Sequence, residues 1–332
     1  MTRTPFGTTR DGTPVEMITL RNDHLSASFL TLGAVLQDLR LPEVPYGLTL
    51  GADTVEAYQT RMSSYGSIMG PIVNRISGAC VTIEGTSYPL EANQDGTHTL
   101  HTGAMGTHKR VWRVADLTDN SLTLTLAQPH LIDGLPGNRH FTVTYSLDQS
   151  SLTFTIEATT DAATLVNFAN HSYWNLDGTP TYAGHTLQIS ADHYLPTTPD
   201  NRPTGAIAPV QDAYDFRQPR TLSADDATFY DHNFCLSTAR QPLRQVAALT
   251  GTSGVALIVS TTEPGLQLYD GGTMGTAPHR GHHGRAYGPY EALALETQFW
   301  PDAPTHPHFP SISVTPDTPY RSETRYAFRA GS

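Results

Sequence analysis

The sequence contains few of the residues that several common mechanisms need. Lys109 is the only lysine among 332 residues, so a lysine Schiff base has a single candidate. Cys80 and Cys235 are the only cysteines, and two distant thiols predict neither a disulfide framework nor a zinc ribbon. Such cysteines are typical of a reducing compartment, where they behave as small buried hydrophobic residues.

Long apolar segments are missing as well. No run of about eighteen apolar residues is present, which argues against a transmembrane helix. The N-terminal segment MTRTPFGTTRDGTP lacks the apolar core of a signal peptide. We therefore expect a soluble, cytoplasmic protein that has no membrane partner.

Positive charge is scarce, because the formal net charge is −11. Binding to nucleic acid needs clustered Lys and Arg to displace counterions from phosphates, so we expect no nucleic-acid partner. The one basic cluster, His108-Lys109-Arg110 with Arg113, is interpreted as a solvated strand edge. With 38% hydrophobic and 15% charged residues, the chain has the composition of a folded globular protein.

Helical patterns are few and short. Thr54–Arg61 has a possible threonine N-cap, and Ser223–Tyr230 begins with SADD, which is typical of a capped turn. Strands do not alternate with long helices, which argues against a doubly wound parallel sheet. The glycines do not form a dinucleotide-binding turn, and no GxSxG motif of a serine nucleophile is present.

The dominant pattern that is present alternates apolar and polar residues with a period of two. It is clearest in Ser121–Gln128, His140–Asp148 and Ser151–Thr160, which it predicts to be half-buried antiparallel strands. The link Leu147–Ser151 suits a hairpin. Since no internal repeat or linker divides residues 1–332, we expect a single domain built as one large β-sandwich.

Two segments contain the strongest candidates for chemistry. NHSYWNL, Asn170–Leu176, contains a histidine and two aromatic residues between asparagines. In EALALETQFW, Glu291–Trp300, alternation places Glu296 on the face opposite the leucines. A carboxylate at the end of an apolar strand is costly unless it is paired or used; the alternative is an exposed strand glutamate.

Four further segments contain polar residues in positions that a binding site could use. In each, a structural interpretation stays open: a turn cap for Asp231, an ion pair for Arg75, and an ordinary loop histidine for His98 or His101. Gln267 and Tyr269 share the strand face opposite two leucines. The segments are YDHNF (Tyr230–Phe234), PIVNRI (Pro71–Ile76), HTLHTG (His98–Gly103) and GLQLYDGG (Gly265–Gly272).

The 15 histidines raise the question of a metal site. The densest clusters are HRGHHG, His279–Gly284, and HPH, His306–His308. Neither has helical i,i+4 spacing, a CxxC partner or a nearby carboxylate at the spacing of metal ligands. We therefore expect no metal and no cofactor. The remaining His, Glu, Arg, Asp and Gln suit proton transfer on a ligand rich in hydroxyl groups.

At these residues the chain resembles the aldose 1-epimerase (galactose mutarotase) family, in collinear order from about Leu32 to the C-terminus. NHSYWNL and ETQFWPDA are the most specific matches. The resemblance implies an all-β fold, a large antiparallel β-supersandwich with a few short helices and an open concave site. It also implies interconversion of the anomers of a free aldose, such as galactose or glucose. The other matching segments are LGAVLQDLRLP (Leu32–Pro42), NRI, LHTG, DGLPGN (Asp133–Asn138), DHNF, PGLQLYDG and the later Phe309-Pro310.

The resemblance also implies roles for particular residues. It makes His171 the general acid and Glu296 the general base. It assigns contacts with a small-molecule sugar substrate to Arg75, His101, Asp231 and Gln267, and less specifically to Asn74. For these roles we expect Glu296 to be ionised and His171 protonated, with the pKa of His171 raised by a nearby carboxylate such as Asp231.

Four residues differ from the family motifs: Pro71, Thr102, Asp270 and Gly272. We expect them to lie at the pocket rim and to influence which sugar is preferred. Alternation places Tyr173 on the face of His171 and Trp174 on the opposite face.

Three alternative functions remain open, and a monomer and a homodimer are equally compatible with the sequence. A hexose-6-phosphate 1-epimerase would need a basic rim, for which Arg280 and Arg285 are candidates. A non-catalytic carbohydrate-binding β-sandwich would not need an acid–base pair. A glycosidase would need two paired carboxylates rather than His and Glu.

Overall fold

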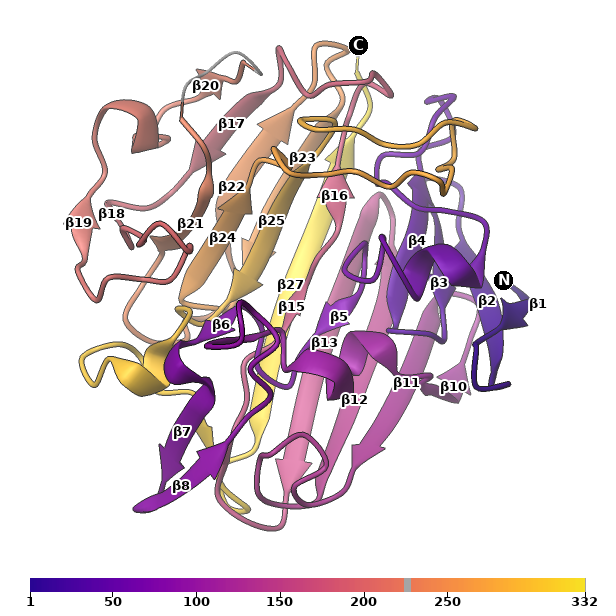
Figure 1. Ribbon diagram of the computed structural model, residues 1–332. Coiled ribbons are helices and arrows are strands. Elements are labelled where there is room, and N and C mark those ends of the chain that lie inside the picture. The colour runs from indigo at the N-terminus through magenta and orange to yellow at the C-terminus, as the bar shows by residue number, and fades with distance from the viewer. Residues whose placement is uncertain (224–227, 332) are drawn as a thin grey trace.

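The structure, a computed structural model, describes residues 1–223 and 228–331. The turn expected at Ser223–Tyr230 lies partly outside these residues. The described chain is built mainly of antiparallel strands, as the period-two pattern predicts (Figure 1).

Two large sheets form the body of the protein. In spatial order the nine-stranded sheet contains β10 (Arg113–Leu117), β11 (Ser121–Gln128), β12 (Arg139–Asp148), β13 (Ser151–Thr160), β27 (Tyr320–Arg329), β23 (Ala256–Thr261), β22 (Arg244–Thr250), β17 (Thr186–Ile189) and β20 (Arg220–Thr221). The six-stranded sheet contains β16 (Tyr173–Trp174), β25 (Leu293–Gln298), β24 (Gly265–Tyr269), β21 (Asp231–Cys235), β18 (His193–Tyr194) and β19 (Ala208–Pro209).

Smaller elements complete the fold. A four-stranded sheet contains β1 (Thr2–Thr8), β2 (Pro14–Arg21), β3 (Ser26–Leu30) and β4 (Val35–Arg40). Short strand pairs are formed by β5 (Ile68–Met69) with β15 (Ala169–Asn170), β6 (Arg75–Ile76) with β9 (Thr99–Leu100), β7 (Cys80–Ile83) with β8 (Thr86–Pro89), and β14 (Thr164–Leu165) with β26 (Ser313–Val314). The helices are α1 (Val55–Tyr58) and the 3-10 turns η1 (Ser77–Ala79), η2 (Gly103–Met105), η3 (Thr107–Lys109), η4 (Asp212–Tyr214) and η5 (Ala303–Thr305).

The predicted strands agree closely with the observed ones. β11 and β13 have the predicted bounds, β12 begins one residue earlier, and Asp148 pairs with Ser151 across the hairpin. The helix expected at Thr54–Arg61 is shorter, and the Thr54 side chain forms no capping hydrogen bond. Both cysteines are unpaired and half-buried. Within the described residues, no helix is long and apolar enough to cross a membrane.

The main core lies between the two large sheets. Leu266 and Leu268 of β24 join Leu293 and Leu295 of β25 in one apolar cluster with residues of β23 and β27, among them Tyr326. Because side chains alternate along a strand, the residues between these leucines face away from the core. The six-stranded sheet therefore presents Gln267 and Glu296 on its other face, where the segment that contains β5, β6 and β9 lies in front of the sheets (Figure 1).

Candidate active site

The position of His171 is set by its neighbours in the NHSYWNL segment. The Asn170 side chain donates a hydrogen bond to the Gly66 carbonyl at 2.9 Å and accepts one from the Ser172 N–H at 3.2 Å. The His171 backbone bonds to Ser67 and Gly66 at 2.9 and 3.0 Å. The asparagine therefore holds an irregular turn between β15 and β16 from which the imidazole projects into the pocket.

The next two residues confirm the predicted alternation. Tyr173 lines the pocket, and its ring centroid lies 5.0 Å from that of His171. Trp174 is fully buried in the main core. The second asparagine, Asn175, donates hydrogen bonds to the carbonyls of Thr179 and Glu291 at 2.8 and 2.6 Å. It thereby ties this segment to the residues that lead into β25.

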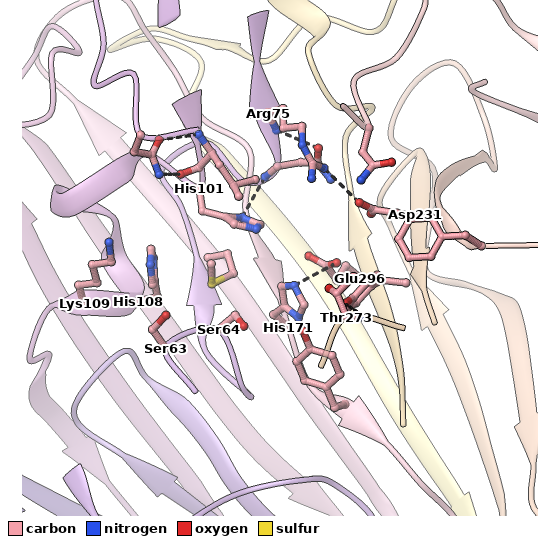
Figure 2. A pocket seen from close by; sticks show the side chains of 18 residues that line it. Ser63, Ser64, Arg75, His101, His108, Lys109, His171, Asp231, Thr273 and Glu296 are labelled. Atoms are coloured by element: carbon pink, nitrogen blue, oxygen red, sulfur yellow. Dashed lines mark hydrogen bonds and ion pairs between the residues drawn. The ribbon is translucent and has the colours of Figure 1, made fainter. Parts of the chain in front are cut away.

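Glu296 reaches the same place from the centre of the six-stranded sheet. Its Oε1 lies 3.5 Å from His171 Nε2 (Figure 2). Both residues are buried, with Glu296 2% and His171 6% exposed. Glu296 Oε2 and His171 Nδ1 have no hydrogen-bond partner among the described residues. The two groups therefore form a close pair with unused capacity for hydrogen bonds to a ligand.

Burial opposes the protonation that the sequence led us to expect for this pair. Burial lowers the pKa of His171 to about 4. Burial, reinforced by the negative charge of Asp231, raises the pKa of Glu296 well above its usual range. The low-dielectric surroundings penalise both charged forms, and no carboxylate raises the His171 pKa enough to offset this. Both shifts disfavour the expected ion pair and favour a protonated carboxyl group beside a neutral imidazole.

Asp231 is the centre of a second polar group beside Glu296. Arg75 Nη1 donates to Asp231 Oδ2 at 3.2 Å (Figure 2). Gln267 Nε2 donates to Asp231 Oδ1 at 2.7 Å. Arg75 Nε also donates to Gln94 Oε1 at 2.9 Å. Arg75 is therefore part of a structural ion pair and also lines the pocket, so the two interpretations of this residue are compatible.

His101 and Asn74 are joined by two hydrogen bonds. The His101 N–H donates to the Asn74 carbonyl at 2.9 Å, and the Asn74 N–H donates to His101 Nδ1 at 3.1 Å. An accepting Nδ1 is unprotonated, so the ring proton of the neutral imidazole is on Nε2. Burial lowers the pKa of His101 well below its usual range. His101 can therefore offer a neutral N–H donor to a ligand.

These groups surround one pocket of about 360 Å³. The lining includes six of the seven residues expected from the sequence, namely Asn74, Arg75, His101, His171, Asp231 and Glu296. Gln267 does not line it and instead contacts Asp231 from below. His98 is also outside the pocket, with its Nε2 3.2 Å from the Asp200 carboxylate.

The four residues that differ from the family motifs do not form the pocket rim, contrary to expectation. None of them lines the pocket. The Thr102 hydroxyl donates to the Ile72 carbonyl and accepts from the Ile72 N–H, both at 3.0 Å. The Asp270 carboxylate accepts from the N–H groups of Tyr230 and Gly272, both at 2.8 Å. The polar atoms of Thr102 and Asp270 are therefore hydrogen-bonded to backbone groups. Since none of the four residues lines the pocket, none of them contacts a sugar bound there.

The Thr102 bridge leads to a prediction about stability. Thr102→Val keeps the shape and the left-handed backbone (φ 59°) but removes the hydroxyl, which leaves both polar groups of Ile72 without that partner. We expect the free energy of unfolding to fall by about 1–3 kcal/mol, measured by urea denaturation. Thr82→Val, at an exposed position of β7, is the matched control. An equal loss in both variants would contradict a special role for the Thr102 hydroxyl.

The interpretation of the basic cluster as a solvated edge is wrong for one of its members. His108 is 5% exposed and lines the pocket, whereas Lys109 and Arg110 are exposed. The cluster is part of the 3-10 turn η3, in which successive side chains point in different directions. No local pattern in the sequence identifies His108 as a pocket residue. Its neighbours in the sequence are charged, and it does not lie in a strand whose alternation would predict the direction of its side chain.

The arginines considered for a phosphate rim are elsewhere. Arg285 makes a two-point ion pair with the buried Glu291, at 2.6 and 2.8 Å. Neither Arg280 nor Arg285 lines the pocket. In the part of the chain that the structure describes, no group of three or more His, Cys, Asp and Glu is arranged to hold a metal ion.

Comparison with known proteins agrees with this geometry. The sequence model of the aldose 1-epimerase family matches residues 16–327. The chain belongs to this family. It is 34% identical to a galactose mutarotase of Rattus norvegicus, with 99% of this chain and 98% of that protein covered. It is 35% identical to an aldose 1-epimerase of Escherichia coli K12, with 96% and 97% covered.

Solved structures give the same result for the aldose 1-epimerase fold. A crystal structure of an aldose epimerase homologue from C. elegans has a TM-score of 0.88 at 31% identity, covering 95% of this chain and 99% of that one. A galactose 1-epimerase from Lactobacillus acidophilus has a TM-score of 0.84 at 25% identity, covering 100% and 99%. The galactose mutarotase-like fold expected from the sequence is therefore confirmed.

Proposed function

We propose that this member of the aldose 1-epimerase family interconverts the α and β anomers of a free aldose such as galactose or glucose. The observation that carries the proposal is the buried pair of His171 Nε2 and Glu296 Oε1, 3.5 Å apart in an open pocket. The ring oxygen and the anomeric hydroxyl of a pyranose are attached to the same carbon. Two groups this close can therefore contact both oxygens at once.

The reaction needs one proton to leave and one to arrive. Glu296 takes the proton of the anomeric hydroxyl while His171 gives a proton to the ring oxygen, and the bond between that oxygen and the anomeric carbon breaks. Rotation about the next C–C bond presents the other face of the aldehyde. Reclosure returns both protons, so the two groups exchange the roles of acid and base. Each such group contributes about 10²–10⁴-fold to the rate.

The directions of these two pKa shifts fit this cycle. With the proton on Glu296 and a neutral His171, the pair is in the form that exists after ring opening. A sugar hydroxyl that donates to the unpartnered Glu296 Oε2 would favour the carboxylate, because a hydrogen bond to the charged form lowers the pKa. We therefore propose that sugar binding moves the proton to His171 and prepares ring opening.

The remaining pocket residues hold the sugar in this proposal. His101 Nε2–H and Arg75 supply donors, the Asp231 carboxylate supplies an acceptor, and Asn74 lies beside them. Gln267 acts as a positioning residue, because its hydrogen bond to Asp231 orients that carboxylate. The Tyr173 ring packs beside His171, where it supports the imidazole and offers a flat apolar surface.

Polarimetry tests the proposed function. Freshly dissolved α-D-galactose and α-D-glucose, followed by pentoses, are mixed with the protein, and the drift in optical rotation is compared with buffer and heat-denatured protein. Faster drift to the same final rotation is expected. If no aldose responds while calorimetry still detects sugar binding, the carbohydrate-binding alternative replaces the enzyme. A response confined to hexose 6-phosphates would favour the phosphate alternative, although Arg280 and Arg285 do not reach the pocket.

The pH dependence follows from the pair of shifted pKa values. Below a pH of about 4 the pair gains a second proton and no base remains, so kcat/KM falls as the pH falls. Above the raised pKa of Glu296 the pair loses its only proton, so kcat/KM falls as the pH rises. We expect a bell-shaped profile whose acid limb lies near pH 4, measured by polarimetry and corrected for the uncatalysed rate. An acid limb at the ordinary histidine value of about 6.5 would contradict this assignment.

Three further proposals concern the whole chain: its domain organisation, its location and its oligomeric state. The family model covers residues 16–327, and we propose that residues 1–332 act as one unit. The half-buried, unpaired cysteines support a cytoplasmic location. The described lining of the pocket comes from one chain, so the site can form in a monomer or in each subunit of a homodimer. Analytical sedimentation distinguishes these two states.

A further inference from the structure

The pocket has two polar ends, and the proposed chemistry uses only one. Figure 2 shows Arg75, Asp231 and Glu296 on one side of His171, and Ser63, His108 and Lys109 on the other. No group at the second end takes part in proton transfer or in the Asp231 network. A sugar whose anomeric carbon lies at the His171–Glu296 pair can extend its far hydroxyl groups toward this end.

His108 is the most unusual residue at this end. It is 5% exposed, and its Nδ1 is buried without a hydrogen-bond partner among the described residues. A buried polar atom without a partner is rare in folded proteins and indicates a bound water or a ligand. The imidazole of His108 therefore has capacity that the folded chain does not use.

Gly106 and His101 pack against the His108 ring. A Cβ on Gly106 would lie 2.5 Å from His108 Cε1 and 2.6 Å from its Nδ1, so the absence of a side chain at Gly106 makes room for the imidazole. The ring also meets His101 edge to face, with centroids 6.4 Å apart. A side chain that is already packed on two sides loses less entropy when it binds a ligand than a free one does, which suits a residue that discriminates between similar sugars.

The electrostatic surroundings define what His108 can recognise. Burial lowers its pKa to about 3, and the charges of Lys109 and His171 act in the same direction. The ring is therefore neutral near pH 7, with one donor and one acceptor nitrogen. The Lys109 ammonium is exposed and already donates to the Gly103 carbonyl at 3.0 Å. A neutral donor–acceptor pair is complementary to a hydroxyl group, whereas a phosphate would require several charged donors.

We propose that His108 is a specificity-determining residue, whose imidazole hydrogen-bonds a sugar hydroxyl at the end of the pocket remote from Asp231. The inference rests on the proposed function and deepens it, because it names a residue through which this chain selects among aldoses. Aldoses that differ at the far end of the ring, in the presence or orientation of one hydroxyl, would be distinguished there. The departures from the family motifs at Pro71, Thr102, Asp270 and Gly272 do not line the pocket, so they do not supply this discrimination by contact.

The test combines His108→Phe with sugars that lack one hydroxyl. The reference is the aldose with the highest kcat/KM for the wild type, or galactose if none is turned over, together with its monodeoxy analogues. For the reference sugar we expect KM to rise about tenfold in His108→Phe, which is the scale of one lost hydrogen bond in a buried site. For one analogue, the KM of the wild type should rise by a similar factor. For that same analogue, the His108→Phe change should raise KM by less than about a further twofold, because the hydroxyl and the imidazole are the two halves of one hydrogen bond and their losses are not additive.

Controls separate recognition from folding. His108→Asn is smaller than the phenyl variant, keeps one polar group near the ring position, and is expected to be intermediate in KM. His140→Asn, at an exposed histidine of β12, is the matched control and should bind like the wild type. Circular dichroism melting identifies variants that do not fold.

Two results would overturn the inference. One is a KM for both folded His108 variants within twofold of the wild type for every sugar. The other is a rise in KM on removal of a hydroxyl that is the same in the wild type and in His108→Phe for every monodeoxy analogue. Calorimetric dissociation constants give the same comparison without turnover. If the wild type binds the sugar but does not epimerise it, the proposed function is overturned, while the binding data still test the role of His108. If the wild type binds no aldose, both proposals are overturned.

Discussion

Glu296→Gln is expected to lower the enzyme-catalysed rate of mutarotation by about 10²–10⁴-fold, the contribution of one acid–base group. The amide has nearly the same shape as the carboxyl group but cannot take up or release the proton that the pair must move. Because Glu296 is 2% exposed and its Oε2 has no partner in the described structure, the change should disturb the fold little. Polarimetry on the preferred aldose measures the loss. His171→Asn, at the other member of the pair, should cause a loss of the same order.

The matched control is Glu43→Gln, at an exposed position, which should keep the wild-type rate. Calorimetry on Glu296→Gln should give a dissociation constant for the sugar within a few-fold of the wild-type value, since the binding groups are intact. A Glu296→Gln variant that keeps more than a tenth of the wild-type kcat/KM would remove Glu296 from the proposed mechanism. Loss of binding together with activity would instead assign it to sugar recognition. The double variant with His171→Asn should be little worse than either single variant, because the two groups act as a unit.

Asp133→Ala is expected to cause the largest loss of stability, about 3–5 kcal/mol, because it leaves a buried guanidinium without its partner. Asp133 and Arg139 form a two-point ion pair at 2.7 and 2.9 Å, and both side chains are fully buried. Arg139 also donates to the carbonyls of Gly137 and Pro129 at 3.2 and 3.3 Å. These contacts close the DGLPGN loop onto the start of β12. Urea or guanidinium unfolding, followed by circular dichroism, measures the change.

A second variant distinguishes the loss of the pair from a general defect of the loop. In Asp133→Ala/Arg139→Met the unpaired charge is absent, so a large part of the lost stability should return. Asp116→Ala, at an exposed position of β10, is the control and should change stability by less than about 0.5 kcal/mol. A loss below about 1 kcal/mol for Asp133→Ala alone would show that water or a loop rearrangement satisfies Arg139. Mutarotation should persist in the folded fraction, since this loop does not line the pocket.

Much of the site could be predicted because the strands that build it have a strict period of two. In β25 the alternation of Leu293, Leu295 and Glu296 predicted which side chains enter the core and which face the pocket. The same argument separated Tyr173 from the fully buried Trp174. A strand specifies the direction of its side chains locally, so such predictions need no knowledge of distant residues.

Two residues whose positions differ from the expectation, Thr102 and His108, lie outside this regular pattern. Thr102 is in a left-handed turn, and its hydroxyl is taken up by Ile72, thirty positions earlier. His108 is in a 3-10 turn beside exposed charges but points into the pocket. Gln267 shares the correct strand face, yet Asp231 lies between it and the pocket. For Thr102 and Gln267 the outcome depends on a hydrogen-bond partner that is distant in the sequence. For His108 it depends on the distant segments that form the rest of the pocket.

The pKa shifts of the proposed acid–base pair also depend on distant residues. Ordinary pKa values predicted an ionised Glu296, but burial reverses the order by lowering the pKa of His171 to about 4 and raising that of Glu296. Burial is a property of the assembled pocket, to which segments from Ser63 to Glu296 contribute. A local sequence pattern therefore cannot predict how far the other segments exclude water from a residue, and so cannot predict the size of its pKa shift.

The sequence by itself determined the all-β architecture, the family and the candidate acid–base pair, because alternation and motif order are local properties of the chain. Only the tertiary structure decided the 3.5 Å approach of His171 to Glu296, the directions of their pKa shifts and the place of His108 in the pocket. These depend on how the β5–β9 segment and the six-stranded sheet meet. Long-range packing sets the distances and the dielectric surroundings of every group in the site.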